Sequence, residues 1–222
     1  MRDVSNLAVH ELRAPLAVAG GYAAMLLDGD MGPVPESWLK PLTAIAEQVA
    51  AAGSMVDSLL LMAKLDNGAP AGEQDLDLVL LAREAGARVE SRIQLVGGTL
   101  TIESDEAEVH ASADRGMVAM IVDNLLNNAL LYGGTAPEVS IRISCFAGPA
   151  ISITDHGRGI APELKGRVFE RFFRVADPSS VGGSGLGLYL SSRLAVRQGG
   201  SVSLDWSERG EGSTFSLRLP AA

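Results

Sequence analysis

The chain has 222 residues, of which 47% are hydrophobic and 20% charged, and its formal net charge at pH 7 is −9. This composition is ordinary for a globular protein, and the length suffices for one large domain or two small ones. The acidic balance argues against sequence-independent nucleic-acid binding and against attachment to an anionic membrane, because both rely on clustered basic residues.

Two long helices are predicted at residues 3–27 and about 37–65, because apolar residues recur at three- to four-residue steps. These residues are Leu7, Leu12, Leu16, Ala19, Ala23 and Leu26 in the first helix, and Leu42, Ile45, Val49, Ala52, Val56, Leu59 and Met62 in the second. Pro15 should kink the first helix or free a backbone carbonyl. The turn formers at 28–37 predict an α-helical hairpin, which would bury both sides of its apolar stripe as a four-helix bundle on dimerisation.

A polar linker at residues 67–74 separates this hairpin, residues 1–67, from a second domain at 75–222. Helices are predicted at 77–92, 114–132 and 187–198, with Asp114 as the N-cap of the second. Strands are predicted at 99–103, 108–111, 139–146, 150–154, 201–205 and 214–219. This mixture predicts an α+β two-layer sandwich. The Gly-, Ser-, Asp- and Pro-rich residues 175–186 predict a mobile loop.

Membrane and redox signals are few. No apolar run approaches the ~20 residues that span a bilayer, and charges near the start interrupt any signal peptide. Cys145 is the single cysteine and lies in an apolar run, so we expect it to be buried in the core. An internal disulfide is excluded, and a reducing cytosolic setting fits.

The first chemical motif is His10-Glu11-Leu12-Arg13-Ala14-Pro15-Leu16. A neutral imidazole at the edge of the apolar stripe is a competent nucleophile. The adjacent carboxylate can accept the other ring proton as attack proceeds. The alternative is an ordinary surface histidine on an amphipathic helix.

The second motif is Asp123-Asn124-Leu125-Leu126-Asn127-Asn128-Ala129, within a helix. Asn124 and Asn128 are four residues apart and share a face. Their amide oxygens suit Mg²⁺, which prefers oxygen ligands and shares phosphate oxygens with a nucleotide. A solvated polar face remains the alternative.

Two glycine-containing motifs follow. Asp155-His156-Gly157-Arg158-Gly159-Ile160 comes directly after an apolar strand, so Asp155 could accept a hydrogen bond from the adenine amine, or the run is simply a tight turn. Gly182-Gly183-Ser184-Gly185-Leu186-Gly187-Leu188 leads into a helix, where backbone N–H groups attract anions. Neither a P-loop nor a dinucleotide motif is complete. The aromatics of residues 169–174 should pack at one end of the loop, and Arg171 and Arg174 could reach phosphate.

The four motifs, in this order, resemble those of the histidine kinases of bacterial two-component systems over nearly the whole chain. The resemblance implies a dimerisation and phosphoacceptor hairpin followed by a Bergerat-type ATP-binding catalytic domain. His10 would be the phosphoacceptor and Glu11 its acid–base partner, with ATP and Mg²⁺ as cofactors and Asn128 as the metal ligand. The implied nucleotide contacts are Asn124, Asn128, Tyr132, Asp155, Gly157, Gly159, Ile160, Arg174, Gly183, Ser184, Gly185, Leu186 and Gly187.

Two positions depart from the family pattern. Ala14 stands where Thr or Asn often orients the water that hydrolyses the regulator's aspartyl phosphate, so we expect weak phosphatase activity. Leu131 stands where a basic residue is common, which removes one expected phosphate contact. Turnover would then be modest, or another basic residue such as Arg174 would substitute.

The resemblance favours ATP-dependent autophosphorylation of His10 and transfer to an aspartate on a response-regulator receiver domain. The implied partners are that domain and a second copy of the chain, bound through residues 1–67. The implied location is the cytoplasm, where the chain could be the cytosolic part of a membrane-bound sensor. The alternative is an ATP-binding signalling module with little kinase activity. A chaperone-type ATPase fits poorly, because Asn124 stands where those enzymes use glutamate.

Overall fold

The computed structural model describes residues 2–66, 72, 74–174 and 184–222, without the side chains of residues 2–13, 54 and 57–66. By its internal contacts the chain divides into two compact units. One comprises Met1–Ala69 with Arg174–Gly187, and the other Pro70–Phe173 with Leu188–Ala222. Among the described residues, no helix carries an apolar stretch long enough to cross a membrane.

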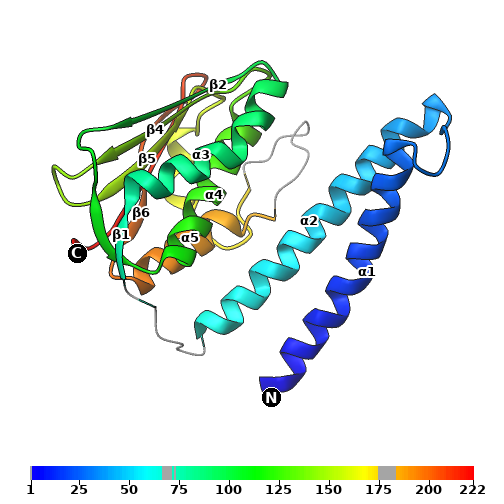
Figure 1. Ribbon diagram of the computed structural model, residues 1–222, viewed down its shortest axis with the longest axis horizontal. Helices are drawn as coiled ribbons and strands as arrows, with labels where there is room; N and C mark the ends of the chain where they lie inside the picture. The colour runs from blue at the N-terminus through cyan, green and yellow to red at the C-terminus, as the bar shows by residue number, and fades with distance from the viewer. Residues whose placement is uncertain (1, 67–71, 73, 175–183) are drawn as a thin grey trace. The chain divides into compact units, whose positions relative to one another are not determined.

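Helices α1 (Arg2–Asp28) and α2 (Glu36–Asp66) form the predicted hairpin (Figure 1). Helix α1 continues through Pro15 rather than ending there. Ala23 is buried, whereas large apolar side chains on both helices are exposed. These are Val18, Tyr22, Met25, Met31, Trp38, Leu39, Ile45 and Met55. The hairpin therefore keeps an extensive apolar surface uncovered within one chain, and Ile45, expected on the buried stripe, is among the exposed residues.

The second unit is built on a five-stranded sheet in the order β2-β4-β5-β7-β6. The strands are β2 (Thr99–Ser104), β4 (Glu138–Ser144), β5 (Ala150–Asp155), β6 (Ser201–Glu208) and β7 (Gly212–Arg218). The β2–β4 pair is parallel and the other three pairs are antiparallel. Helices α3 (Leu78–Leu95), α4 (Arg115–Tyr132) and α5 (Gly187–Arg197) cover one face of the sheet, so the predicted two-layer sandwich is confirmed (Figure 1).

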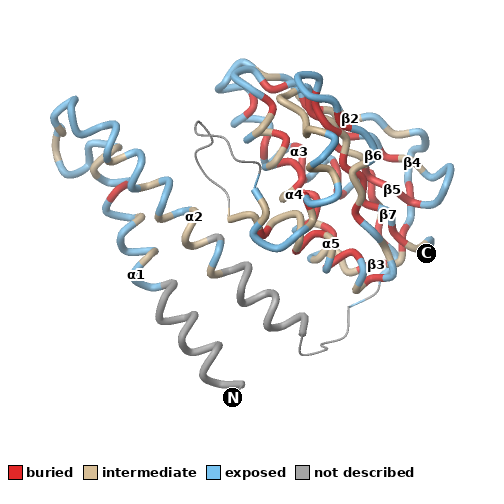
Figure 2. Tube along the Cα trace, turned by 180° about the vertical axis from the view of Figure 1, so that it is seen from behind, coloured by how far each residue is buried: buried red, intermediate tan, exposed pale blue. Residues whose placement is uncertain are grey.

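The core lies between this sheet and its helices, where Figure 2 shows the buried residues gathered. Strand alternation explains it: Ile141 and Ile143 of β4 and Ile151 of β5 are fully buried, and polar residues stand between them. Asp114 caps α4 as predicted, because its Oδ1 accepts the Met117 N–H at 3.0 Å.

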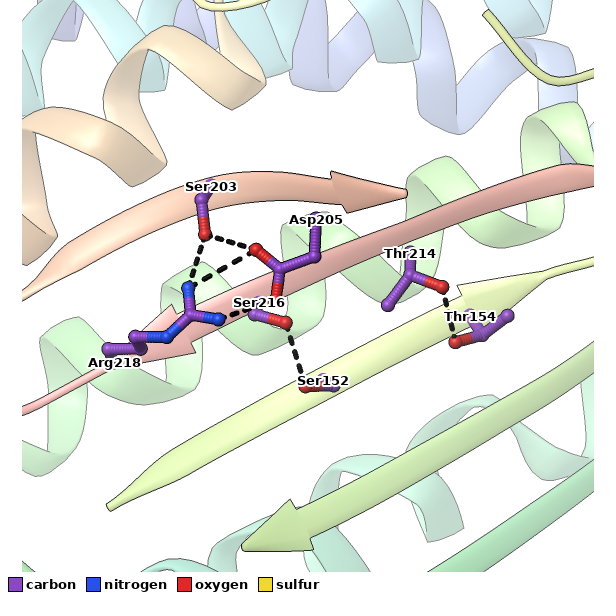
Figure 3. A network of polar contacts seen from close by, with 7 residues as sticks. All are labelled: Ser152, Thr154, Ser203, Asp205, Thr214, Ser216 and Arg218. Carbon is purple, nitrogen blue, oxygen red and sulfur yellow. Dashed lines mark hydrogen bonds and ion pairs between the residues drawn. The ribbon is translucent and has the colours of Figure 1, made fainter. Parts of the chain in front are cut away.

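The other sheet face carries polar pairs across neighbouring strands (Figure 3). The hydroxyl oxygens of Ser152 and Ser216 lie 2.7 Å apart. Arg218 Nη2 donates to Asp205 Oδ2 at 2.6 Å. Partial burial alone would raise the pKa of Asp205, but hydrogen bonds from Arg218 and Ser203 lower it. These hydrogen bonds therefore pair polar side chains across β5, β6 and β7 on this face.

The strand predicted at 108–111 is β3 (His110–Ala113), shifted by two residues, whereas its antiparallel partner β1 (Gln74–Asp77) was not predicted. His110 joins the two strands, because its Nδ1 donates to Asp75 Oδ1 at 2.6 Å, and Nε2 lies 3.3 Å from Glu108 Oε2. The hydrogen bond with Asp75, and then that with Glu108, raises the pKa of His110. Helix α3 starts directly after β1, because the Asp77 side chain accepts the Val79 N–H.

One expectation about the core is wrong. Cys145 is exposed, and Phe146 beside it is 100% exposed. Strand β4 ends at Ser144, and a turn containing Gly148 at φ 98° follows. The apolar run therefore extends past the strand, and its last members lie in a turn rather than in the core.

Candidate functional site

Asp155 is the last residue of β5 and one of the few buried polar residues among those described, at 5% exposed. Its Oδ1 accepts the Gly157 N–H at 3.0 Å. Burial raises the pKa of Asp155, while the hydrogen bond from Gly157 partly offsets that rise. The Ser213 N–H also donates to this carboxyl group. A carboxylate has about four acceptor sites, so one oriented by two backbone N–H groups can still accept from a donor such as an adenine amine.

The loop after Asp155 lies directly against the end of α4. A Cβ at Gly157 would stand 1.9 Å from the Tyr132 carbonyl oxygen, so only glycine permits this approach. The Arg158 N–H donates to the same oxygen at 3.2 Å, and the Arg158 guanidinium lies 4.4 Å from the centre of the Tyr132 ring. The motifs containing Asn124 and Asp155 therefore meet at Tyr132.

The other side of the loop lies on the β6–β7 hairpin. Gly159 has φ 62°, and a Cβ there would stand 1.9 Å from the Glu208 carbonyl oxygen. The Ile160 N–H donates to Ser207 Oγ at 2.8 Å. For Gly157 and Gly159, the close approach in the structure is thus to protein backbone, and their contact with a nucleotide stays a prediction.

Three residues of this hairpin escaped sequence reasoning. Gly212 has φ 120°, and a Cβ there would meet the Asp155 carbonyl oxygen at 1.9 Å. Ser213 pairs with Asp155 in the sheet, and its hydroxyl lies 3.0 Å from that of Ser207. In the sequence these residues are only a glycine and two serines near the end of the chain, and they form no recognisable motif. Their role becomes visible only once the pairing of β7 with β5 is known.

Helix α4 presents three asparagines in different surroundings. Asn124 Nδ2 donates to Ser191 Oγ of α5 at 2.9 Å. Asn127 Oδ1 accepts from Arg92 of α3 at 2.9 Å. Within the described chain, the half-buried Asn128 amide makes no side-chain hydrogen bond, so both of its ends remain open to a ligand.

The aromatic segment before the predicted loop is only partly packed. Phe169 contacts Phe215 edge-on, with ring centres 6.3 Å apart. Phe172 instead has φ 64° and is 52% exposed, with Arg171 4.8 Å from its ring centre. The expected packing role thus holds for Phe169 and is wrong for Phe172.

The glycine-rich segment leads into α5 as predicted, although most of the predicted loop at 175–186 lies outside the described residues, Gly183 included. Ser184 Oγ accepts the Leu186 N–H at 3.3 Å, and Leu186 is fully buried. Gly185 has φ 67°, and Gly187 is the first residue of α5. Arg174, the last described residue before position 175, is exposed.

His10 and Glu11 lie on α1, while their side chains are outside the described part of the molecule. Ala14, one turn later, is exposed. Leu131 of α4, where a basic residue was expected, is 45% exposed. The roles assigned to all these residues remain predictions.

The described residues fit a bound nucleotide better than a metal held by protein alone. Asp155 supplies a buried acceptor, and the Asn128 amide oxygen is unengaged. No three His, Cys, Asp or Glu side chains in the described ranges lie close enough to hold a metal ion. An amide oxygen with phosphate oxygens and water is a donor set that suits Mg²⁺.

Two protein families match the chain. Residues 1–68 match the His Kinase A (phospho-acceptor) domain. Residues 113–222 match the family of histidine kinase-, DNA gyrase B- and HSP90-like ATPases. The two matches divide the chain in the same order as its chemical motifs.

Curated relatives extend over the whole chain. The sensor-like histidine kinase SenX3 of Mycolicibacterium smegmatis is 31% identical over 99% of this chain and 57% of its own length. The sensor histidine kinase TrcS of Mycobacterium tuberculosis is 32% identical over 99% of this chain and 44% of its own. The chain thus spans about half the length of these relatives.

Solved structures share the fold. Full-length ShkA in complex with AMPPNP superposes with a TM-score of 0.74 at 26% identity, over 99% of this chain and 47% of ShkA. Histidine kinase ThkA in complex with response regulator protein TrrA has a TM-score of 0.69 at 21% identity, over 99% of this chain and 61% of ThkA.

Proposed function

The chain belongs to the sensor histidine kinases of two-component systems, and on that premise we propose that it phosphorylates its own His10 with Mg²⁺·ATP. The observation that carries this proposal is the convergence of two motifs on Tyr132. Asp155, buried at 5% exposure, and the helix bearing Asn128 are held together there through Gly157 and Arg158. That is the arrangement a nucleotide needs to contact both at once.

The proposed binding roles follow from these surroundings. Asp155 accepts a hydrogen bond from the adenine amine, and burial makes this contact selective because an unmatched donor or acceptor there is costly. Asn128 contributes its free amide oxygen to Mg²⁺. Ser184, Gly185 and Gly187, at the start of α5, contribute backbone N–H groups to the phosphates, whereas the Leu186 N–H is held by Ser184 Oγ. When bound, Mg²⁺ neutralises charge on the phosphate oxygens.

The proposed chemistry is an in-line displacement at the γ-phosphorus. A ring nitrogen of His10 forms a bond to phosphorus, while the bond to the β–γ bridging oxygen breaks and ADP leaves with its electron pair. Glu11 accepts a hydrogen bond from the other ring nitrogen and stabilises the positive imidazolium. An aspartate of a response-regulator receiver domain then takes the phosphoryl group from His10, which restores the neutral ring.

We also propose that two copies of the chain pair through residues 1–67. Val18, Tyr22 and Met25 are 58%, 56% and 42% exposed on α1, at helical spacing. On α2, Trp38 and Ile45 are 58% and 51% exposed. Side chains this large rarely remain uncovered in groups on a monomer, and a four-helix bundle would bury them.

The proposed location of this chain is the cytoplasm, because that is where ATP and a receiver domain would be available to it.

The test is transfer of label from γ-labelled ATP to the purified chain. Wild type should acquire acid-labile label, and His10→Gln should acquire none. Asp155→Ala should lose both label and nucleotide binding, whereas His156→Ala, at the neighbouring exposed residue, should keep both. If wild type binds ATP but is never labelled, the chain is an ATP-binding signalling module instead.

A further inference from the structure

Helix α5 carries one buried serine that no motif includes. Ser191 is 1% exposed and accepts the hydrogen bond from Asn124. We propose that Ser191 is a positioning residue, which turns the oxygen of the Asn124 amide toward Mg²⁺·ATP by holding its nitrogen. The inference rests on the proposed function, because it concerns the same nucleotide site.

The geometry gives Ser191 control over one torsion. The last side-chain torsion of asparagine has no sharp preference, so a neighbour must decide which end of the amide faces which way. Asn124 Nδ2 lies 2.9 Å from Ser191 Oγ. Because the amide is planar with its nitrogen and oxygen on opposite sides, Oδ1 is directed away from Ser191.

The orientation matters because the two ends of the amide interact oppositely with a cation. An amide oxygen is a ligand for Mg²⁺, directly or through water, whereas an amide NH₂ in its place would repel the ion. Asn128 lies one turn further along the same face of α4, and its amide is not engaged by the described residues. Because Ser191 holds the Asn124 side-chain nitrogen, the amide oxygens of both Asn124 and Asn128 can face Mg²⁺.

Asn127 shows the opposite arrangement on the same helix. Its Oδ1 accepts from Arg92 at 2.9 Å, so its oxygen is turned toward α3. Asn127 therefore ties α4 to α3, whereas Asn124 keeps its acceptor available. The contrast separates a structural asparagine from one prepared for a ligand.

The position of Ser191 also connects α5 to the helix that carries Asn124. Ser191 is one turn beyond Gly187, where α5 begins. Two turns later, Gln198 Oε1 accepts the Asp114 N–H at the start of α4, at 2.7 Å. Helix α5 is thus joined to α4 at Ser191 and, just past its end, at Gln198, and these two contacts hold Ser191 in place beside Asn124.

The experiment measures binding of AMPPNP to the full chain over a range of Mg²⁺ concentrations and in EDTA. Ser191→Ala should raise the Mg²⁺ concentration for half-maximal binding by about threefold to tenfold, as expected for one lost hydrogen bond. Its metal-free nucleotide affinity should stay within about twofold of wild type. Ser191→Thr, which keeps a hydroxyl, should retain the wild-type Mg²⁺ dependence.

Two controls isolate the mechanism. Ser192→Ala changes the next serine of α5, which makes no side-chain hydrogen bond in the described structure, and should alter nothing. In an Asn124→Ala background, Ser191→Ala should have no further effect on the Mg²⁺ dependence.

Three results would overturn the role of Ser191. They are an unchanged Mg²⁺ dependence in Ser191→Ala, an equal loss of binding with and without Mg²⁺, or the same shift in the Asn124→Ala background. If wild type binds AMPPNP normally, these results leave the proposed function standing. If wild type binds no nucleotide, the proposed function and the role of Ser191 both fall.

Discussion

The contact between Gly157 and the end of α4 yields a quantitative prediction. In Gly157→Ala, the added Cβ would lie 1.9 Å from the Tyr132 carbonyl oxygen and 2.7 Å from the Gly133 Cα. Both are backbone atoms, so no side chain can rotate to make room. The loop must move away from α4 by roughly an ångström or more, because ordinary contacts between such atoms need about 3.4 Å or longer.

That movement has two costs. Overpacking of this kind destabilises proteins by about 1–3 kcal/mol, and loss of the hydrogen bond from the Arg158 N–H to Tyr132 adds about 1 kcal/mol. We therefore expect Gly157→Ala to lower the free energy of unfolding of the unit formed by Pro70–Phe173 and Leu188–Ala222 by about 2–4 kcal/mol. For a unit of this size, the corresponding fall in melting temperature is roughly 4–16 °C.

The assay is thermal denaturation of the full chain, following the transition that ATP raises. Gly166→Ala is the matched control, because no atom lies within 4 Å of its added Cβ, and its effect should stay within about 0.5 kcal/mol. Gly157→Ala should also weaken nucleotide binding, since the Gly157 N–H holds Asp155. Equal melting temperatures for Gly157→Ala and Gly166→Ala would refute this reasoning.

Three further predictions follow from individual side chains. Burial raises the pKa of Asp155, so the folded state favours its protonated form and this residue costs stability as pH rises through its folded pKa. In urea titrations, Asp155→Asn should therefore be more stable than wild type at pH 7 but not at pH 3, and greater stability of wild type at pH 7 would contradict this. The same variant should lose nucleotide binding. The pKa of His110 is raised by Asp75 and then Glu108, so its contribution is fully present below the unfolded pKa of about 6.5 and lost as pH rises through the folded value. His110→Gln should therefore lower the melting temperature at pH 6 more than at pH 9, and an equal loss at both would count against the ion pairs. Ala14→Thr places a hydroxyl one turn after the phosphoacceptor, so the chain should release phosphate from the phosphorylated regulator about 10²-fold faster, at the lower end of the range for general acid–base assistance. An unchanged release rate would exclude this role for the position.

Local patterns predicted much of the fold because they act over a few residues. The spacing of apolar residues gave both hairpin helices, and the alternation around Ile141 and Ile151 gave the central strands. Asp114 was recognisable as a cap because the bond it makes spans only three residues. In each case the determining contact lies within one helix turn or one strand.

Features that depend on distant partners were missed. Strand β1 is four residues long, with exposed polar positions, and exists by pairing with β3 some thirty-five residues later. The exposure of Cys145 reflects where β4 stops, and an apolar run does not show where a strand ends. Sequence spacing alone encodes neither fact.

The candidate site likewise contains residues that a local motif identifies and residues that only long-range contacts identify. Asp155 and its glycines stand in a compact motif and could be singled out directly. Ser191 and Ser207 contact Asn124 and Ile160 across separations of 67 and 47 residues. Serine is common and these two have no motif, so only the folded arrangement shows that they support the site.

The most direct test of the whole account is to identify which residue becomes phosphorylated. The chain has three histidines, His10, His110 and His156. After incubation with Mg²⁺·ATP, mass spectrometry at neutral pH should find phosphate on His10 alone, and acid should remove it. Phosphate on another residue, or none on a chain shown to bind ATP, would contradict the assignment of His10 as the phosphoacceptor.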